Sequence, residues 1–347
     1  MLTERQSRIL GFIIGEYVEH AAPVASQYIE QNYPVGASAA TIRNEMAELE
    51  EQGYLNHPHT SSGRVPTGKG YRLYVESLMR EEEVPWDAQQ TILHQFHQIE
   101  QGQESWAQLA AAVLAQSVQN AAVVTTPRMD ICRIKHLELV SLHDMTFLLV
   151  LVLDEGRLEQ QVLSSGGLYS QEELSATATQ LNRRYEGKTS KELAGAEAEL
   201  SELELLVMEA VHSVMRSVDE GGAEEAHLEG LRHVLSQPEF SDSEAVLGLL
   251  ELLDGQNLSR AIPLRALARE GVTVIIGADS PQLANASDAM RACSVIVGSY
   301  GAPGDASGAL AVVGPMRMRY SRTISTVRYL ADVMSELLSE QYEGPTG

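Results

Sequence analysis

Residues 37–51 combine an apolar helical stripe with a face of small, hydrogen-bonding side chains. Ile42, Met46 and Leu49 recur at helical spacing, so they predict a helix that packs its apolar face inward. At about 100° per residue, the opposite face carries alanines, one arginine and one asparagine. Small residues let a helix approach base edges in the major groove, where asparagine can pair with adenine and arginine with guanine. The predicted base-contacting residues are Ser38, Ala40, Thr41, Arg43 and Asn44.

Two further helices must hold that face in place. An apolar stripe predicts a first helix over residues 3–19, and the chain restarts after Pro23 in a short helix over residues 24–31. The Ser38 hydroxyl can cap the third helix, and Gly53 ends it. Three short helices are common in proteins, so spacing alone also permits the small-residue face to pack against another helix.

A polar, basic loop between two short apolar segments follows the three helices. Residues 54–55 and 64–65 bracket a loop rich in hydrogen-bond donors, which predicts two strands joined as a hairpin. Helix, turn, helix and hairpin is the order of a winged helix, whose wing typically reaches a phosphate strand or the minor groove. This order favours DNA binding over helix packing. The predicted contacts of the wing and its flank are His57, His59, Thr60, Ser61, Ser62, Arg64 and Lys69.

Two other chemistries are less well supported by the residues of the same region. His57 and His59 could bind a metal ion, but no third or fourth ligand lies nearby in the sequence. The segment Thr67-Gly68-Lys69-Gly70 lacks the spacing of a phosphate-binding loop, so an NTPase is not indicated. Thr67 is better placed to cap a helix over residues 68–80.

The charge of the chain is strongly uneven. The chain has 347 residues, 44% of them hydrophobic, and a formal net charge of −23. Residues 52–75 contain no acidic residue, and this window is interpreted as the one electropositive stretch of any length. Because the acidic remainder would be repelled by DNA, specificity is left to a small docking face.

Composition also limits the compartment and the class of protein. The longest apolar run, residues 145–153, is about half the length of a membrane span, and the first residues carry no signal-peptide core. Cys132 and Cys293 cannot form a disulfide framework and are expected to pack in cores, which fits a reducing cytoplasm. No convergent acid, base and nucleophile set is found, so we expect no catalytic residues, metal or cofactor.

Several motifs spread over the chain are shared with one family. They are Ala40 to Met46, Pro58 to Arg64, Leu235 to Phe240, and Val313 to Met318. These motifs resemble the HrcA family of heat-inducible transcription repressors, over nearly the whole chain. Residues 21–26 lack the glycines that family members usually carry there, which affects the expected turn geometry and neither the wing nor the third helix.

The resemblance implies a homodimeric repressor of heat-shock (chaperone) operons that binds an inverted-repeat operator and is modulated by the GroE chaperonin. It implies an α+β protein with a winged helix-turn-helix, a GAF-like α/β domain with an antiparallel sheet, and a mainly helical inserted dimerisation segment. A second hypothesis is a ligand-gated transcriptional regulator that senses a small molecule through the GAF-like domain.

The expected limits follow from composition and from this resemblance. Residues 1–80 are assigned to the DNA-binding domain, 81–103 to a linker and connecting helix, 104–169 and 226–342 to the GAF-like domain, and 170–225 to the insertion. Strands expected on both sides of the insertion, among them residues 134–142, 145–153 and 158–163, are assigned to one sheet.

The insertion contains a broad apolar stripe that permits two interpretations. It could be an internal core helix, or it could be a dimer surface, since a palindromic operator requires a two-fold protein. The resemblance favours the dimer surface. The residues assigned to it are Leu203, Leu206, Val207, Val211 and Val214.

Overall fold

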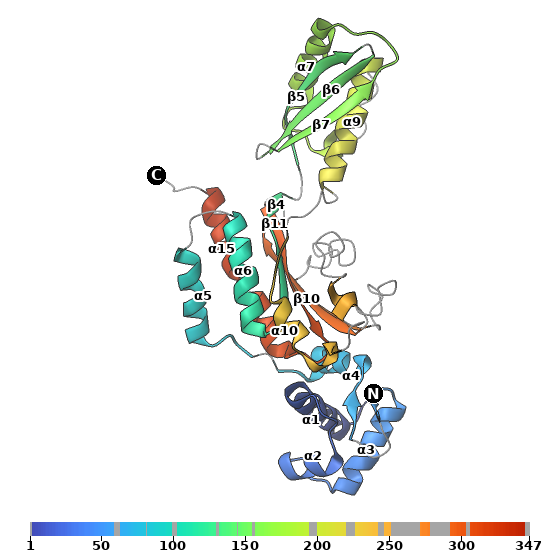
Figure 1. The fold of residues 1–347 in the computed structure, drawn as a ribbon, viewed down its shortest axis with the longest axis vertical. Helices are drawn as coiled ribbons and strands as arrows, with labels where there is room; N and C mark the ends of the chain where they lie inside the picture. Colours follow the sequence, from blue (N-terminus) through green and yellow to red (C-terminus); the bar gives the residue numbers. More distant parts are fainter. Residues whose placement is uncertain are drawn as a thin grey trace. The chain divides into compact units, whose positions relative to one another are not determined.

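The computed structural model divides the chain into two compact units, each described here by itself. The larger unit comprises Met1–Pro127, Glu225–Gly301 and Ser307–Gly347, and the smaller comprises Arg128–Glu224 and Ala302–Ala306. Both mix helices with antiparallel sheets, as expected of the α+β class (Figure 1). The structure describes residues 2–58, 63–80, 82–98, 103–129, 132–143, 145–154, 157–193, 200–219, 226–241, 246–250, 271–277, 292–302 and 306–343.

The N-terminal part of the larger unit consists of short helices and a hairpin. The core beneath them is formed by Ile9, Ile13, Ile42 and Leu49, which are fully buried, so the helical stripes predicted from spacing are confirmed. The elements are α1 (Glu4–His20), α2 (Ser26–Asn32), α3 (Ala39–Glu51), β1 (Leu55–Asn56), β2 (Val65–Pro66), α4 (Gly68–Leu73) and the π-helical turn η1 (Tyr74–Leu78).

A short backbone pairing connects the link between α1 and α2 to the hairpin. Val24 and Arg64 exchange two backbone hydrogen bonds, of 2.9 and 2.8 Å. The second helix therefore begins at Ser26 rather than at Val24, because Val24 is extended. Gly63 permits this approach, since a Cβ atom there would overlap the carbonyl oxygen of Val24.

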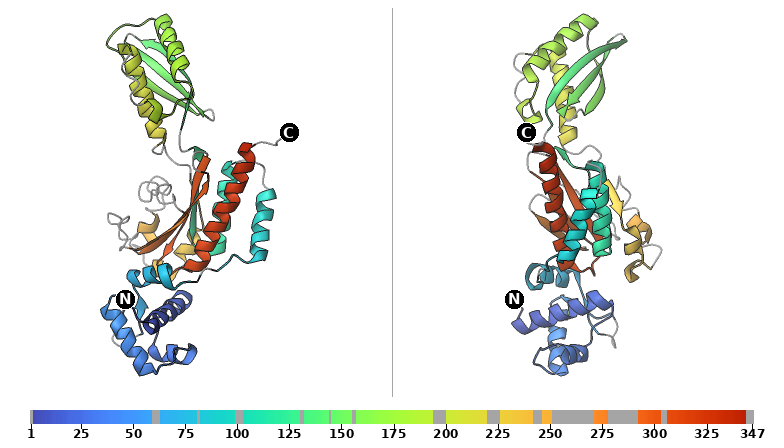
Figure 2. Two further views of the ribbon diagram at one scale, coloured as in Figure 1. Left: turned by 180° about the vertical axis from the view of Figure 1, so that it is seen from behind. Right: turned by 90° about the vertical axis from the view of Figure 1, so that its left-hand side faces the viewer.

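The rest of the larger unit is an antiparallel sheet with strand order β8-β3-β11-β10-β9. Helices α6 and α15 pack together on one face of it (Figures 1 and 2). On the other face, Phe240 and Leu249 pack on strand residues such as Val123 and Val295. The elements are α5 (Trp86–Gln98), α6 (Gln103–Val118), β3 (Ala121–Thr125), β8 (Ala226–Glu229), α10 (Leu231–Leu235), the 3-10 turn η4 (Pro238–Phe240), β9 (Val272–Ile276), β10 (Cys293–Gly301), β11 (Ala306–Pro315) and α15 (Tyr320–Glu343).

The smaller unit has a separate sheet with strand order β5-β6-β7, covered on one face by α7 and α9 (Figure 1). Its core contains Leu139, Phe147, Leu151, Leu181 and Val211. The elements are β4 (Arg128–Met129), β5 (Ile134–His143), β6 (Thr146–Leu153), β7 (Leu158–Ser164), α7 (Gln171–Tyr185), α8 (Ser190–Leu193) and α9 (Glu202–Asp219).

This arrangement corrects the expected strand pairing. Residues 134–143, 146–153 and 158–164 do not join the sheet of the later strands, because β6 pairs with β5 on one side and β7 on the other. Their buried face packs on α7 and α9, so strands and helices form one compact unit that begins at Arg128 rather than at residue 170. No helix in the described ranges is long and apolar enough to cross a membrane.

Candidate nucleic-acid interface

One face of α3 is open to solvent and has free hydrogen-bonding groups. Ala40, Arg43 and Asn44 are exposed and Thr41 is half-buried, while the other side of the helix is in the core. Within the part of the chain that the structure describes, the Arg43 and Asn44 side chains have no hydrogen-bond or ion-pair partner. The geometry therefore places the two side chains that can read bases on the same exposed surface.

Ser38 lies at the N-terminal end of α3, where its side chain caps the helix. Its Oγ accepts a hydrogen bond from the backbone N–H of Thr41 at 3.3 Å and lies 3.1 Å from Thr41 Oγ1. This is the N-cap arrangement expected from the sequence, and it fixes the start of α3. Ser38 therefore positions the helix that carries Arg43 and Asn44.

Three carboxylates of α3 are paired with other parts of the N-terminal region. Arg5 Nε donates to Glu45 Oε1 at 2.7 Å, and Gln6 Nε2 donates to Glu48 Oε2 at 2.7 Å. Arg64 Nε lies 2.7 Å from Glu50 Oε2. The two arginines offset the charges of Glu45 and Glu50, which reduces the repulsion between this part of α3 and a phosphate backbone.

The hairpin positions only some of the predicted wing residues. His57 is half-buried, whereas His59, Thr60, Ser61 and Ser62 lie outside the described residues. The Arg64 side chain is 16% exposed and faces Glu50, although its N–H does not point directly at the carboxylate. The contact with Glu50 gives Arg64 a role in holding the hairpin against α3.

Lys69 is also bound within the protein. Its Nζ donates to the carbonyl oxygen of Gln52 at 2.7 Å and lies 4.4 Å from the centroid of the Tyr54 ring. Gln52 is the C-cap of α3, where a cation interacts favourably with the helix dipole. Thr67 caps α4 as predicted, because its Oγ1 accepts from Gly70 N at 3.2 Å. Lys69 therefore stabilises the end of α3 by contacts that the sequence did not indicate.

Arg317 joins the end of α1 to the sheet domain. Its Nη1 donates to the carbonyl oxygen of Val18 at 2.8 Å, and its Nε donates to Glu239 Oε1 at 2.6 Å. Nearby, the Tyr71 and Tyr320 ring centroids are 5.8 Å apart, and burial raises the pKa of both hydroxyls. No functional role for Arg317 was predicted from the sequence, although this residue lies in the motif from Val313 to Met318.

Comparison with known proteins decides the family. A family model described as the HrcA protein C-terminal domain matches residues 104–324. A Roseiflexus castenholzii protein named heat-inducible transcription repressor HrcA is 42% identical over 359 residues, covering 99% of this chain and 97% of that protein. This chain belongs to the HrcA family. It is therefore a transcription repressor rather than an enzyme.

Other comparisons agree with this HrcA assignment. A Dehalococcoides mccartyi protein of the same name (strain 195) is 40% identical over 347 residues, covering 100% of this chain and 99% of that protein. A crystal structure of a hypothetical protein has a TM-score of 0.56 and 24% identity, covering 97% of this chain and 98% of that chain. The similarity to this crystal structure concerns the fold alone.

The residues assigned to a dimer surface on α9 need correction in this HrcA protein. Leu203 is 6% exposed and Val207 and Val211 are fully buried, while Leu206 and Val214 pack against the same core. They pack on the core of their own unit, which favours the internal-helix interpretation for Leu203, Val207 and Val211, while Leu206 and Val214 are half-buried.

The opposite face of the β5–β7 sheet is apolar and has no cover among the described residues. Leu148 on β6 lies between Val140 on β5 and Val162 on β7. Val140 is 42% exposed and Val162 is 60% exposed. We call this surface the outer face. Its apolar residues are Val140, Leu148, Val150, Val152, Leu158 and Val162, and the polar residues on it include His136, Glu138 and Gln160. The sequence held the signal, since residues 147–153 are apolar at every position, where a strand with one solvated face alternates.

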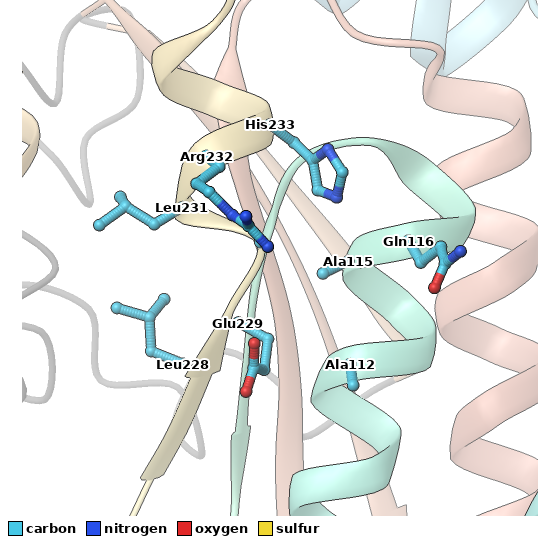
Figure 3. A pocket seen from close by; sticks show the side chains of 9 residues that line it. Ala112, Ala115, Gln116, Leu228, Glu229, Leu231, Arg232 and His233 are labelled. Atoms are coloured by element: carbon cyan, nitrogen blue, oxygen red, sulfur yellow. The ribbon is translucent and has the colours of Figure 1, made fainter.

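A cleft of about 380 Å³ lies between α6 and the segment from β8 to α10. Figure 3 shows Arg232 reaching across it above Glu229, with Ala112 and Ala115 on the α6 side. The described ranges contain no group of three His, Cys, Asp or Glu side chains able to hold a metal ion. The lining of the cleft combines polar side chains with alanine and leucine side chains.

Proposed function

We propose that this chain represses heat-shock (chaperone) operons by binding an inverted-repeat operator as a homodimer. The observation that carries the proposal is the exposed face of α3, on which Arg43 and Asn44 have no partner among the described residues. Arginine and asparagine in a major groove distinguish guanine and adenine from the other bases. The heat-inducible repression in this proposal is based on the names of the relatives, which are heat-inducible transcription repressors.

The N-terminal region fits the proposed winged helix-turn-helix. In this proposal α2 and α3 form the helix-turn-helix, α3 enters the major groove, and the hairpin of β1 and β2 is the wing. Ala40 and Thr41 lie beside the base-reading pair. The wing tip, residues 59–62, reaches the phosphate strand or the minor groove, and Arg64 holds its base against α3.

We place the dimer contact on the outer face of the smaller unit instead of on α9. A two-fold axis brings this face against its own copy, so apolar residues on one subunit cover apolar residues on the other. The face has few charged or titratable residues. Two of them are neighbours that contact each other, since His136 Nε2 lies 3.0 Å from Glu138 Oε1. The smaller unit is then the inserted dimerisation domain, and the β8–β9 sheet with its helices is the GAF-like domain.

The proposal includes a cytoplasmic location and modulation by the GroE chaperonin, which come from the family resemblance. Exposed apolar side chains of the kind seen on the outer face are a surface that an unpaired subunit would present to a chaperone. Assembly of the dimer would remove that surface.

A gel-shift experiment tests the proposal. Purified protein is titrated against an inverted-repeat operator, a single half-site and a scrambled duplex, with and without chaperonin and ATP. We expect the inverted repeat to bind far more tightly than the other two duplexes, and chaperonin with ATP to raise the active fraction. Equal affinity for all three duplexes would contradict sequence-specific, two-fold binding.

A further inference from the structure

A second cleft of about 380 Å³ in the larger unit is lined by an unusual number of basic groups. It lies among the end of α1, the end of α6, the segment from α10 to η4, and the start of α15. The charged or titratable side chains in its lining are Glu19, His233, Arg317, Arg319 and Arg322.

Two of the three arginines in this cleft have guanidinium N–H groups that are not bonded to another described residue. Arg322 is exposed, and its guanidinium has no partner in the described part of the chain. Arg319 Nη2 donates a hydrogen bond to Glu19 Oε2 at 2.6 Å, and the Arg319 side chain is 57% exposed. Arg317, by contrast, is committed to Val18 and Glu239. Arg319 and Arg322 are therefore the groups available to an incoming ligand.

The charge of this region departs from that of the rest of the protein. The chain has a net charge of −23, yet residues 306–331 contain four arginines and no acidic residue. Residues 52–75 are therefore not the only electropositive stretch of the chain, contrary to the expectation from the sequence. Inside the cleft, Arg319 and Arg322 lie beside one carboxylate, Glu19, while Glu82 and Glu83 line a separate pocket that Arg322 also borders. The two guanidinium groups attract anions on the side that faces the cleft.

We propose that this cleft binds a small molecule carrying a diphosphate group, such as a nucleoside diphosphate or triphosphate. Guanidinium groups match phosphate oxygens with paired donors, and Arg319 and Arg322 are three residues apart, so each can address one phosphate. The remaining lining includes the half-buried Val18 and Val118, which offer apolar surface to an organic group. The volume lies in the range of small-molecule sites, roughly 300 to 1,000 Å³.

A ligand in this cleft contacts both α1 and α15. Because α1 packs on α3 through Arg5 and Gln6, a ligand at the end of α1 would stabilise the base-reading helix in its present setting on the sheet domain. This inference goes beyond the proposed repression, and the binding step itself does not involve DNA.

Thermal unfolding of the full chain without DNA tests the binding step. ADP, ATP, AMP, inorganic pyrophosphate and sulfate are added at constant ionic strength. We expect ADP, ATP and pyrophosphate to raise Tm with concentration, since a ligand bound only by the native state stabilises it, whereas AMP and sulfate raise it little. Tighter binding of ADP than of pyrophosphate would identify a nucleotide as the ligand, and equal binding would identify the diphosphate group alone.

Two variants show whether the effect belongs to this cleft. Arg322→Gln removes an exposed, unpaired charge without disturbing the fold and is expected to weaken ADP binding about tenfold. Lys135→Gln removes an exposed charge from the smaller unit and should leave binding unchanged. The proposal is overturned by no rise in Tm, by an equal rise with sulfate, or by unchanged binding in folded Arg322→Gln protein.

Discussion

Arg317 donates from Nη1 to the backbone carbonyl oxygen of Val18 at 2.8 Å, while its Nε holds Glu239 at 2.6 Å. One side chain thus satisfies a carbonyl at the C-terminal end of α1 and a carboxylate of η4. The Arg317 side chain is only 14% exposed, so this contact is shielded from water and salt. It connects the helices that carry α3 to the sheet domain.

Replacing Arg317 should therefore lower stability more than replacing a neighbouring arginine. Arg317→Met leaves Glu239 and the Val18 carbonyl without their partner, at a cost of about 2 kcal/mol in the free energy of unfolding. Arg319→Met is the matched control, because its ion pair with Glu19 is exposed and contributes less than about 1 kcal/mol. Urea unfolding of both variants measures the difference, and equal losses would contradict a special role for Arg317.

Arg43 should determine base preference. We expect Arg43→Ala to cost about 1 to 3 kcal/mol of operator binding and to relax specificity at one base pair, with little effect on scrambled DNA. Titrations on the operator and on single-base variants measure this. A uniform loss on all sequences would mean that Arg43 contacts phosphate only.

Lys69 should behave as a structural residue. Its bond to the Gln52 carbonyl and its contact with Tyr54 predict that Lys69→Ala lowers the free energy of unfolding by about 1 kcal/mol. The slope of log affinity against log salt should stay close to that of the unmodified protein, because this ammonium group is not free to release a counterion. A slope smaller by about one unit would instead show a direct phosphate contact.

The outer face of the smaller unit should control assembly. Val162→Lys places a charge on an exposed apolar row and is expected to convert dimers into folded monomers, which bind a half-site but lose tight binding to the inverted repeat. Gln161→Lys, on the same strand and also exposed but on the other face, is the control. Sedimentation velocity measures the outcome, and dimers in the Val162→Lys protein would place the contact elsewhere.

Two glycines should respond oppositely to alanine. Gly63→Ala drives a Cβ atom into the Val24 carbonyl oxygen, so it should break the Val24–Arg64 pairing and destabilise the N-terminal region. Gly11→Ala meets open space inside α1, where alanine is the better helix former, and should stabilise by about 0.5 to 1 kcal/mol. Thermal unfolding distinguishes them, and a stable Gly63→Ala protein would show that the close approach is not required.

Alkaline pH should destabilise the protein through its thiols. Burial raises the pKa of Cys132 and Cys293 to about 12, whereas their ordinary value is 9.0. Above about pH 9 the unfolded chain loses these protons and the native chain keeps them, so the free energy of unfolding falls as pH rises. Cys293→Ala should reduce that slope between pH 9 and 11, and an unchanged slope would mean that Cys293 ionises alike in both states.

Local features of the N-terminal region could be predicted because they depend on neighbours in sequence. The Ile42 and Leu49 spacing identifies the buried face of α3, and the Ser38 hydroxyl reaches a backbone N–H three residues away. The exposure of Arg43 follows from the same periodicity. Each of these inferences needs only helix geometry.

Contacts between distant segments could not be predicted in the same way. Lys69 reaches Gln52 across a hairpin, and Arg317 reaches Val18 from the other end of the chain. The pairing of β6 was misassigned because an all-apolar strand fits any sheet covered on two sides. Periodicity shows which side of an element is apolar, but it does not show which partner covers it.

The position of β3 in its sheet has a consequence for biosynthesis. This strand, Ala121–Thr125, is hydrogen-bonded to β8 on one edge and to β11 on the other, and both are translated long after it. A ribosome therefore releases an early, mainly apolar strand whose neighbours do not yet exist. Such delayed pairing is slow and prone to aggregation, so the nascent chain has a physical need for protection until its last helix is made.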